Sequence, residues 1–198
     1  MRSPRIPSGS SILKLGLLAG LSSACATAPL ETESLEIMGA TVKPPPHPEL
    51  ELLQPMVGSW KGQSKLVHPA SSDGGEPVVL EGGGRAEWAL GGMVLKREGW
   101  RQVGEGQISN YVEYIAWDPK AGKFHTWFHD DWGQSGEGWL SLDPDGRTFR
   151  YRAKQSRFDG GVSEGEGTAV FVSDDVVEWT WTADGGAQRL EGTDRRSR

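Results

Sequence analysis

The sequence contains one cysteine, Cys25, so it forms no internal disulfide bond. Alanine- and leucine-rich stretches are confined to the first thirty residues, and no amphipathic helical repeat follows them. Parallel strands need crossover connections that are usually helical, so this absence excludes an α/β fold. The formal charge is −6 and no Lys/Arg cluster is interleaved with aromatic residues, which argues against nucleic-acid binding.

Features typical of several enzyme classes are also missing. The glycine-rich runs at 82–84, 136–138 and 165–167 do not lead from a strand into a helix, so they are not phosphate-binding loops. No strand-to-helix turn is predicted that would expose a serine nucleophile. The sequence therefore assigns no catalytic residues, no metal ligands and no cofactor, and an enzyme is the less favoured interpretation.

Glycine and tryptophan, by contrast, are abundant. The chain has 28 glycines, about twice the usual share of roughly 7%, and 9 tryptophans, which favours strands and turns over helices. After Gly58 the sequence consists of short alternating runs bounded by turn residues. The predicted strands are Ser59–Val67, Val78–Leu90, Met93–Val103, Ile108–Asp118, Phe124–Asp130, Glu137–Leu142, Thr148–Phe158, Glu166–Val172, Val176–Thr182 and Gln188–Thr193.

Turn sequences such as Asp118–Gly122 and Asp143–Gly146 suit tight hairpins between these strands. An antiparallel meander of this length commonly removes its exposed edges by closing on itself. Glycines inside the strands fit the bends that closure requires. We therefore predict one all-β domain over residues 49–198, in which a short N-terminal helix at Glu49–Val57 is followed by an antiparallel up-and-down barrel of about ten strands.

The N-terminal segment has the layout of an export signal. Arg2, Arg5 and Lys14 precede an apolar run of about ten residues, which is too short to span a bilayer. Small residues then abut Cys25, which resembles a bacterial lipoprotein signal in which the cysteine is lipidated. The alternative is ordinary cleavage after Ala28, which would discard the cysteine.

Residues 25–48 are polar and proline-rich, and they end in Pro44-Pro45-Pro46-His47-Pro48, which favours an extended spacer. We expect residues 1–24 to be a lipoprotein-type signal peptide and residues 25–48 to be a tether on which His47 is solvated. The protein is then expected in the bacterial cell envelope, with the membrane as a partner through the lipid anchor.

Alternation predicts which side chains face the barrel axis. Trp60 shares a face with small residues and opposes lysines, Trp88 shares a face with Ala86, and Trp179 and Trp181 lie together against Glu178. The residues that we predict to bind a ligand are Trp60, Trp88, His125, Trp127, His129, Tyr151, Trp179 and Trp181. The orientation of Met93–Val103 is ambiguous, but an inward Arg97 or Arg101 would anchor an acidic group of the ligand.

His125 and His129 belong to an aromatic stretch, Lys123–Gln134, and share one face of a strand with Trp127. Two strand residues four apart are separated by about 13 Å, too far to share a metal ion. The favoured interpretation places both histidines at the border of the barrel mouth. Two alternatives stay open, namely a single histidine as the axial ligand of a haem and a barrel-lined isomerase or hydrolase that uses His125 or His129.

Gly58-Ser59-Trp60 resembles the Gly-x-Trp signature of lipocalins and fatty-acid-binding proteins, the calycin group of ligand-binding barrels. A longer set of residues is similar to a bacterial family catalogued as domain of unknown function 1579: Leu52 to Trp60, Gly91-Gly92, Tyr114 to Asp118, Trp127 and Asp143 to Gly146. The resemblance covers about Leu50 to Arg196 and implies a barrel. The lipocalin resemblance also implies a late arginine packed over Trp60, for which Arg189 and Arg195 are candidates.

These observations predict that the barrel binds a small apolar or amphipathic molecule in an aromatic-lined interior. The alternative from another class is an envelope structural or interaction protein whose barrel is filled by side chains.

Overall fold

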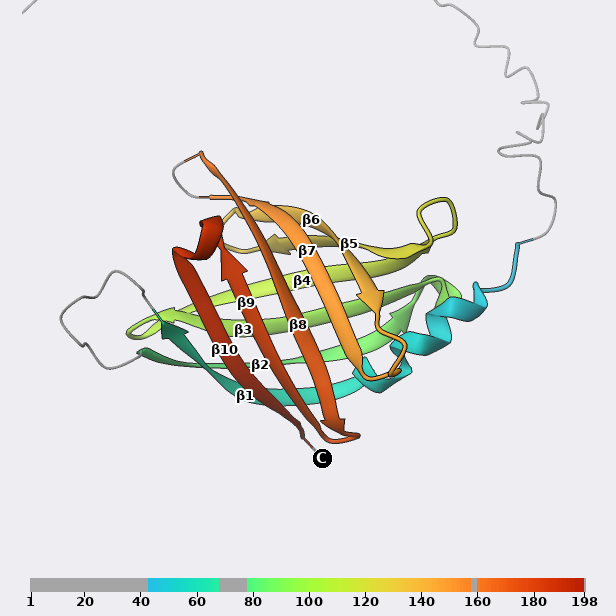
Figure 1. The fold of residues 1–198 in the computed structure, drawn as a ribbon, viewed down its shortest axis with the longest axis horizontal. Helices are drawn as coiled ribbons and strands as arrows, with labels where there is room; N and C mark the ends of the chain where they lie inside the picture. Colours follow the sequence, from blue (N-terminus) through green and yellow to red (C-terminus); the bar gives the residue numbers. More distant parts are fainter. Residues whose placement is uncertain (1–42, 68–77, 158–159, 198) are drawn as a thin grey trace, which may run out of the picture. The chain divides into compact units, whose positions relative to one another are not determined.

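The computed structural model describes residues 43–67, 78–157 and 160–197 (Figure 1). Every strand described below belongs to one compact unit, Pro44–Arg198. The expected signal peptide and most of the expected tether lie outside the described residues. In the part that the structure describes, no helix has both the length and the apolar character needed to cross a membrane.

Ten strands follow one short helix, as the alternating sequence runs predict. The 3-10 helix η2 spans Pro48–Met56, and the single-turn elements η3 and η4 span Leu90–Gly92 and Asp184–Gly186. The strands are β1 (Gly58–Val67), β2 (Val78–Ala89), β3 (Val94–Gly104), β4 (Gln107–Asp118), β5 (Lys123–Asp130), β6 (Ser135–Leu142), β7 (Thr148–Ser156), β8 (Val162–Ser173), β9 (Val176–Ala183) and β10 (Gln188–Arg196).

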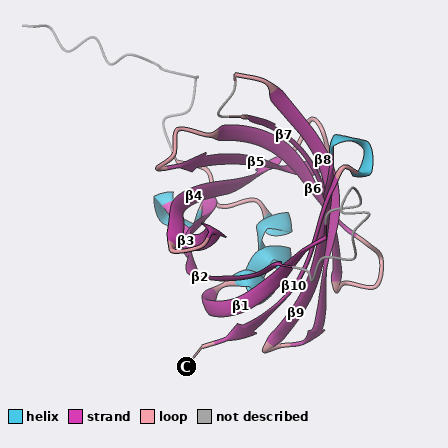
Figure 2. Cartoon of the chain, turned by 90° about the vertical axis from the view of Figure 1, so that its left-hand side faces the viewer, coloured by secondary structure: helices cyan, strands magenta, loops and turns pink. Residues whose placement is uncertain are grey.

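All ten strands form one closed antiparallel barrel, which confirms the predicted fold class. Each strand pairs with its neighbours in sequence, and β10 pairs with β1 to close the ring (Figure 2). Closure leaves no strand edge unpaired, so backbone hydrogen bonds are satisfied around the whole ring. The boundaries agree with the prediction to within a few residues. The largest differences are β8, which begins four residues early, and β10, which ends three residues late.

One end of the barrel is packed solid around η2. Leu50 and Leu53 of the helix are buried, and they form a single apolar cluster with inward residues of the strands. Each large side chain that leaves water here stabilises the fold by about 1.5–3 kcal/mol. The strand residues of this cluster are Ala86, Leu95, Ile115, Phe124, Leu140, Phe149, Phe171 and Val177.

His47 is exposed to solvent as we expected, but its side chain contacts η2 and the barrel. Its imidazole Nδ1 accepts a hydrogen bond from the backbone N–H of Glu49 (3.3 Å), so it caps η2. Its ring also stacks on Trp117, with ring centroids 5.3 Å apart. The side chain is exposed but held by these two contacts, so the barrel unit begins before residue 49.

Arg196 fastens η2 to the barrel wall. Its guanidinium lies over the Trp60 ring, 4.4 Å from the centroid, and donates hydrogen bonds to the carbonyls of Val57, Pro55 (3.0 Å) and Asp174 (3.0 Å). The Trp60 indole in turn donates to the carbonyl of Met56 (2.9 Å). A late arginine over the opening tryptophan is what the lipocalin resemblance implies, but the residue is Arg196, not Arg189 or Arg195.

We expect Arg196→Met to lower the free energy of unfolding by about 2 kcal/mol, because charge-assisted hydrogen bonds and a cation–π contact are lost together. Urea unfolding at neutral pH measures the change. Arg195→Met, on the neighbouring exposed position, should cost less than about 0.5 kcal/mol. Equal effects of the two substitutions would contradict the assignment.

Candidate ligand-binding interior

Aromatic rings on the inner wall lie opposite glycines of the neighbouring strand. Tyr151 pairs with Gly167, and Trp179 pairs with Gly192. A Cβ added at Gly167 would lie 2.7 Å from the Tyr151 ring, and one added at Gly192 would lie 2.4 Å from the Trp179 ring. The rings therefore rest flat on the wall where a side chain is missing, instead of extending to the barrel axis.

Trp181 follows the same pattern. A Cβ at Gly165 would lie 2.2 Å from its ring, and the ring stacks on Tyr151 with centroids 5.3 Å apart and an interplanar angle of 6°. The Tyr151 hydroxyl donates a hydrogen bond to the carbonyl of Thr180 (2.9 Å), which holds the ring in place. Strands β7, β8 and β9 thus present a continuous aromatic surface to the interior.

Charged side chains face this surface from the other side of the barrel. Arg97 of β3 forms an ion pair with Glu113 of β4, with Nη1 and Oε2 2.7 Å apart. The Arg97 charge also interacts with Asp194 of β10 and with Tyr151 of β7. Residues from four strands therefore converge on one interior region. Burial lowers the pKa of Arg97, but the neighbouring Glu113 carboxylate and the other groups outweigh it and raise the pKa above its ordinary value.

The interior at this level is not filled by protein. The Arg97 side chain is enclosed by the barrel, yet 39% of its surface is exposed, and Glu113 is 19% exposed. Tyr151, Trp179 and Trp181 are likewise only half-buried although they face inward. An inward side chain keeps such exposure only beside open space, so a polar and aromatic space lies beyond the apolar cluster at η2.

Asp194 contributes to this space a carboxyl group whose pKa is raised above its ordinary value. Burial raises its pKa, whereas the hydrogen bond from the Trp179 indole and the charge on Arg97 lower it, and the net shift is upward. The position requires Gly62 on the neighbouring strand, because a Cβ there would collide with the carboxyl oxygen. Burial similarly raises the pKa of Tyr151, so its phenol stays protonated at neutral pH.

The raised pKa of Asp194 predicts a pH dependence of stability. A carboxyl whose pKa rises on folding holds its proton better in the native state, so its contribution is present at low pH. The contribution is lost as the pH rises from the ordinary value of about 3.9 through the raised value. The stability of the wild type relative to Asp194→Asn should therefore fall as the pH rises above about 4.

Urea unfolding of both proteins between acidic and neutral pH measures this difference. Asp145, in an exposed turn, provides a control of opposite sign, because the hydrogen bond from Thr148 lowers its pKa. Wild type relative to Asp145→Asn should lose stability as the pH falls. A difference for Asp194 that rises with pH would refute its assignment.

A second charged group lies further from η2. Arg101 donates to Asp130 (3.1 Å) and lies over the Phe128 ring, 5.1 Å from its centroid. The Asp130 side chain has no exposed surface, and it also accepts from Ser109 (3.2 Å) and from the backbone N–H of Gln134 (2.9 Å). This carboxylate is fully engaged in holding the β5–β6 turn. The Arg101 Nε is buried without a hydrogen-bond partner among the described residues.

The structure divides the predicted ligand-binding residues into three groups. Tyr151, Trp179 and Trp181 line the open interior as predicted. Trp60 and Trp88 also point inward, but they lie at the packed end: Trp60 beneath Arg196, and Trp88 donating its indole N–H to Gln54 of η2 (3.2 Å). Their role in the described structure is packing.

His125, Trp127 and His129 lie on the outer face of β5, so they do not line the interior with the other predicted ligand-binding residues. Phe124 and Thr126, which alternate with them, are buried at 1% and 9% exposure. Neither histidine reaches a ligand inside the barrel, which removes both as axial ligands of an interior haem and as catalytic groups in the interior. Among the described residues, no three His, Cys, Asp or Glu side chains are grouped to hold a metal ion.

One serine has the spacing of a nucleophile motif. Gly161-Val162-Ser163-Glu164-Gly165 matches Gly-x-Ser-x-Gly, but Ser163 lies within β8 and is only 3% exposed. The nucleophile of that motif needs a sharp strand-to-helix turn. The match is therefore a coincidence of spacing.

Glu113, Asp194 and Tyr111 belong to the interior and were missed in the sequence. Tyr111 lies against Gly99, where a Cβ would be 2.8 Å from its hydroxyl. A signal for all three was present, since each shares an alternating face with an apolar or glycine residue: Ile115 on β4 and Gly192 on β10. A strand face that carries acidic residues is easily assigned to the outer surface of the barrel.

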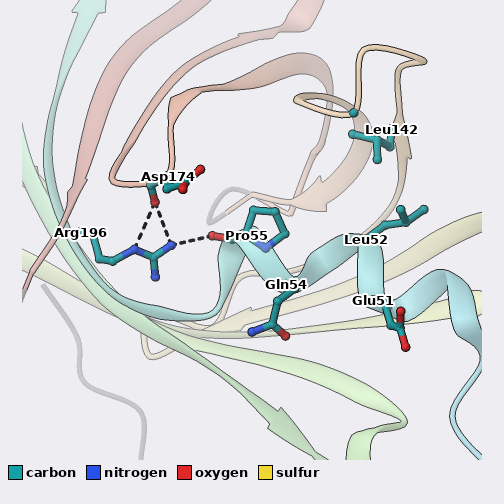
Figure 3. A pocket seen from close by; sticks show the side chains of 8 residues that line it. Glu51, Leu52, Gln54, Pro55, Leu142, Asp174 and Arg196 are labelled. Atoms are coloured by element: carbon teal, nitrogen blue, oxygen red, sulfur yellow. Dashed lines mark hydrogen bonds between the residues drawn. The ribbon is translucent and has the colours of Figure 1, made fainter.

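Two hollows lie outside this interior. One, of about 470 Å³, separates η2 from the turn at Gly146 and from Asp174, and Arg196 in it is already committed to backbone carbonyls (Figure 3). The other, of about 1030 Å³, is lined mainly by outward residues of β8, β9, β10, β1 and β2, with lysines and glutamates intermixed, and also by Trp100 of β3 and Trp179 of β9. The described lining of the first hollow includes no aromatic ring, and the second places Trp100 and Trp179 among lysines and glutamates.

Comparison with known proteins agrees with this architecture. The family described as "Protein of unknown function (DUF1579)" matches residues 45–188. The chain belongs to the DUF1579 family. Among curated proteins, no sequence relative was found.

Two solved structures show the same type of fold as this DUF1579 protein. Rv2717c from M. tuberculosis is 15% identical with a TM-score of 0.55, and the match covers 78% of this chain and all of that one. An S-type phycobiliprotein lyase from Guillardia theta is 10% identical with a TM-score of 0.51, covering 75% of this chain and 92% of the lyase. At these identities the likeness concerns the fold alone.

Proposed function

We propose that this DUF1579 protein binds a small amphipathic molecule inside its barrel. The apolar part of the ligand lies on the aromatic surface of Tyr151, Trp179 and Trp181, and its polar part meets Arg97, Glu113 and Asp194. The observation that carries the proposal is the exposure of Arg97 inside a closed barrel, beside rings that rest on glycines. An interior with a few convergent polar groups on an aromatic wall is typical of ligand sites.

The fold comparisons support this proposal only in general terms. The phycobiliprotein lyase shows that a barrel of this type serves in a protein that acts on another molecule. The polar groups of the interior belong to this chain's own sequence, so we expect the chemistry of the ligand to be determined by these groups. An envelope structural protein with a filled barrel is the alternative, and the exposed Arg97 argues against it.

The test is mass spectrometry of organic extracts of the protein purified from its native host. We expect a small molecule at near-stoichiometric amount in the wild type and its loss in Trp181→Ala. Trp132→Ala, an exposed tryptophan in the β5–β6 turn, is the control that should keep it. A clean extract, together with no quenching of tryptophan fluorescence by added fatty acids, would favour the filled barrel.

We further propose that the protein is exported and held to a membrane of the cell envelope by a lipid on Cys25. The support is the sequence alone: a basic start, a short apolar run and small residues before the single cysteine. Labelling cells with an alkyne fatty acid should mark the wild type but not Cys25→Ser, and the variant should leave the membrane fraction. A mature chain that begins at Pro29 would refute lipidation.

A further inference from the structure

Four aromatic side chains gather on the outer face of β4, β5 and β6: Tyr114, His125, Trp127 and Trp139. Tyr114 pairs with Trp127 across β4 and β5, and His125 pairs with Trp139 across β5 and β6. The His125 ring stacks on Trp139 with centroids 4.4 Å apart and an interplanar angle of 12°. It lies 4.2 Å from the Trp127 ring at 51°. We call these four residues the outer aromatic face.

The outer aromatic face is exposed to solvent. Tyr114, Trp127 and Trp139 are 36%, 37% and 38% exposed, so each ring is partly covered by its neighbours and keeps part of its surface free. Single exposed hydrophobic side chains are ordinary, but contiguous groups of them mark interaction sites. The core does not need these rings, because the inner side of β5 is supplied by Phe124, Thr126 and Phe128.

The charges around the outer aromatic face are balanced. Lys96, Arg152 and Lys154 each lie within ion-pair distance of a carboxylate on the same outer surface, and Lys123 lies opposite Asp118 in the register of β4 and β5, so basic and acidic side chains around the described face are matched in number. The surface therefore suits neither an anionic lipid headgroup nor a phosphate backbone. The ion pairs are Lys96 with Glu98, Arg152 with Glu166 (3.1 Å) and Lys154 with Glu164 (2.7 Å), and Nε2 of His125 lies 3.9 Å from the Glu137 carboxylate.

We propose that the outer aromatic face is a binding platform for an uncharged glycan. A pyranose ring has a flat face of C–H groups, which carry small positive charges and are attracted to the negative face of an aromatic ring. Its hydroxyl groups donate to and accept from paired charged side chains without requiring a net charge. Partly covered rings offer faces for stacking, whereas membrane insertion needs projecting apolar side chains with unpaired cations around them.

The arrangement favours a chain of sugars over a single one. Tyr114 and Trp127 form one row across two strands, and His125 and Trp139 form the next row on β5 and β6. Neighbouring strands are about 4.8 Å apart, so the rings cover more area than one pyranose occupies. The glycan site is separate from the interior and does not depend on the ligand proposed for it.

The test uses chitotetraose and maltohexaose as probes, titrated into the full-length protein and followed by isothermal calorimetry and by tryptophan fluorescence. We expect the wild type to bind at least one probe. The affinity should fall about tenfold or more in Trp127→Ala/Trp139→Ala, because stacking on each ring raises the affinity by a factor of that size. Trp127→Phe/Trp139→Phe, which keeps flat rings, should stay within about threefold of the wild type.

Controls separate this site from the interior and from folding. Trp132→Ala and Arg97→Met should bind the probes like the wild type, and Trp127→Leu/Trp139→Leu gives a second loss variant that keeps apolar area in the strands. Thermal unfolding shows which variants are folded. The proposal is overturned by no binding of either probe, by undiminished binding in both loss variants, or by binding to phosphatidylglycerol vesicles that depends on the same two tryptophans.

Discussion

Gly165→Ala is expected to lower the free energy of unfolding by about 3 kcal/mol and to abolish ligand binding in the interior. The added Cβ would lie 2.2 Å from Cζ2 and 2.6 Å from Cε2 of Trp181, closer than non-bonded carbon atoms approach one another. The indole would have to leave the wall and turn toward the barrel axis, where the ligand is proposed to lie. Urea unfolding and the extraction experiment measure the two effects.

Gly82→Ala is the matched control, because Gly82 is also an inward glycine within a strand. A Cβ there has its nearest contact at 3.3 Å, with the carbonyl of Trp100, so the cost should be well below that at Gly165. The double variant Gly165→Ala/Trp181→Ala should cost less than the sum of its parts, since the ring that collides is absent. Strict additivity would mean that the ring does not rest on this glycine.

Arg97→Met is expected to lower the free energy of unfolding by about 2 kcal/mol and to weaken ligand binding at least tenfold. The substitution leaves Glu113, 19% exposed, without its cation, and removes the polar anchor of the site. Removing one partner of a fully buried pair costs about 3–5 kcal/mol. The value here is smaller because 39% of the Arg97 side chain is in contact with solvent.

The outer ion pair of Arg152 and Glu166 is the control for Arg97. Its nitrogen and oxygen are 3.1 Å apart, but the side chains are 80% and 68% exposed. Exposed pairs contribute about 0–1 kcal/mol, so Arg152→Met should change stability little and leave the interior ligand bound. If both arginines behaved alike, the interior would be as wet as the outer surface and would hold no enclosed site.

The strands could be predicted because turn residues and alternation are local signals. Asp143 to Gly146 forms a turn in which Asp145 accepts from the N–H groups of Arg147 and Thr148, as its sequence suggests. Phe149 and Tyr151 faced Arg150 and Arg152 across an unambiguous alternation, and the structure confirms their orientation. In such strands one face is apolar and the other charged, so the phase follows from composition.

The phase of β5 could not be read in the same way, because both of its faces carry aromatic rings. We favoured the face with His125 and Trp127, whereas the face with Phe124 and Phe128 packs inward. Phenylalanine has no polar atom and loses nothing on burial, while histidine and tryptophan keep donors that need partners. The contrast between phenylalanine on one face and histidine and tryptophan on the other therefore indicates that Phe124 and Phe128 face inward, as they do in the structure.

The interior charges depend on contacts that are distant in sequence. Arg97 lies on β3, where three consecutive charged residues, Lys96 to Glu98, hide the alternation. Its partners Glu113 and Asp194 come from β4 and from β10, at the far end of the chain. Only the closed register brings β10 beside β1 and places these groups around one space. Local pattern alone cannot predict such a cluster.

A crystal structure of the protein purified from its native host tests the account most directly. We predict that Tyr151, Trp179 and Trp181 lie flat on Gly167, Gly192 and Gly165, with electron density for a small molecule between these rings and Arg97. Rings that turned to the axis and packed against the opposite wall, leaving no space beside Arg97, would contradict it.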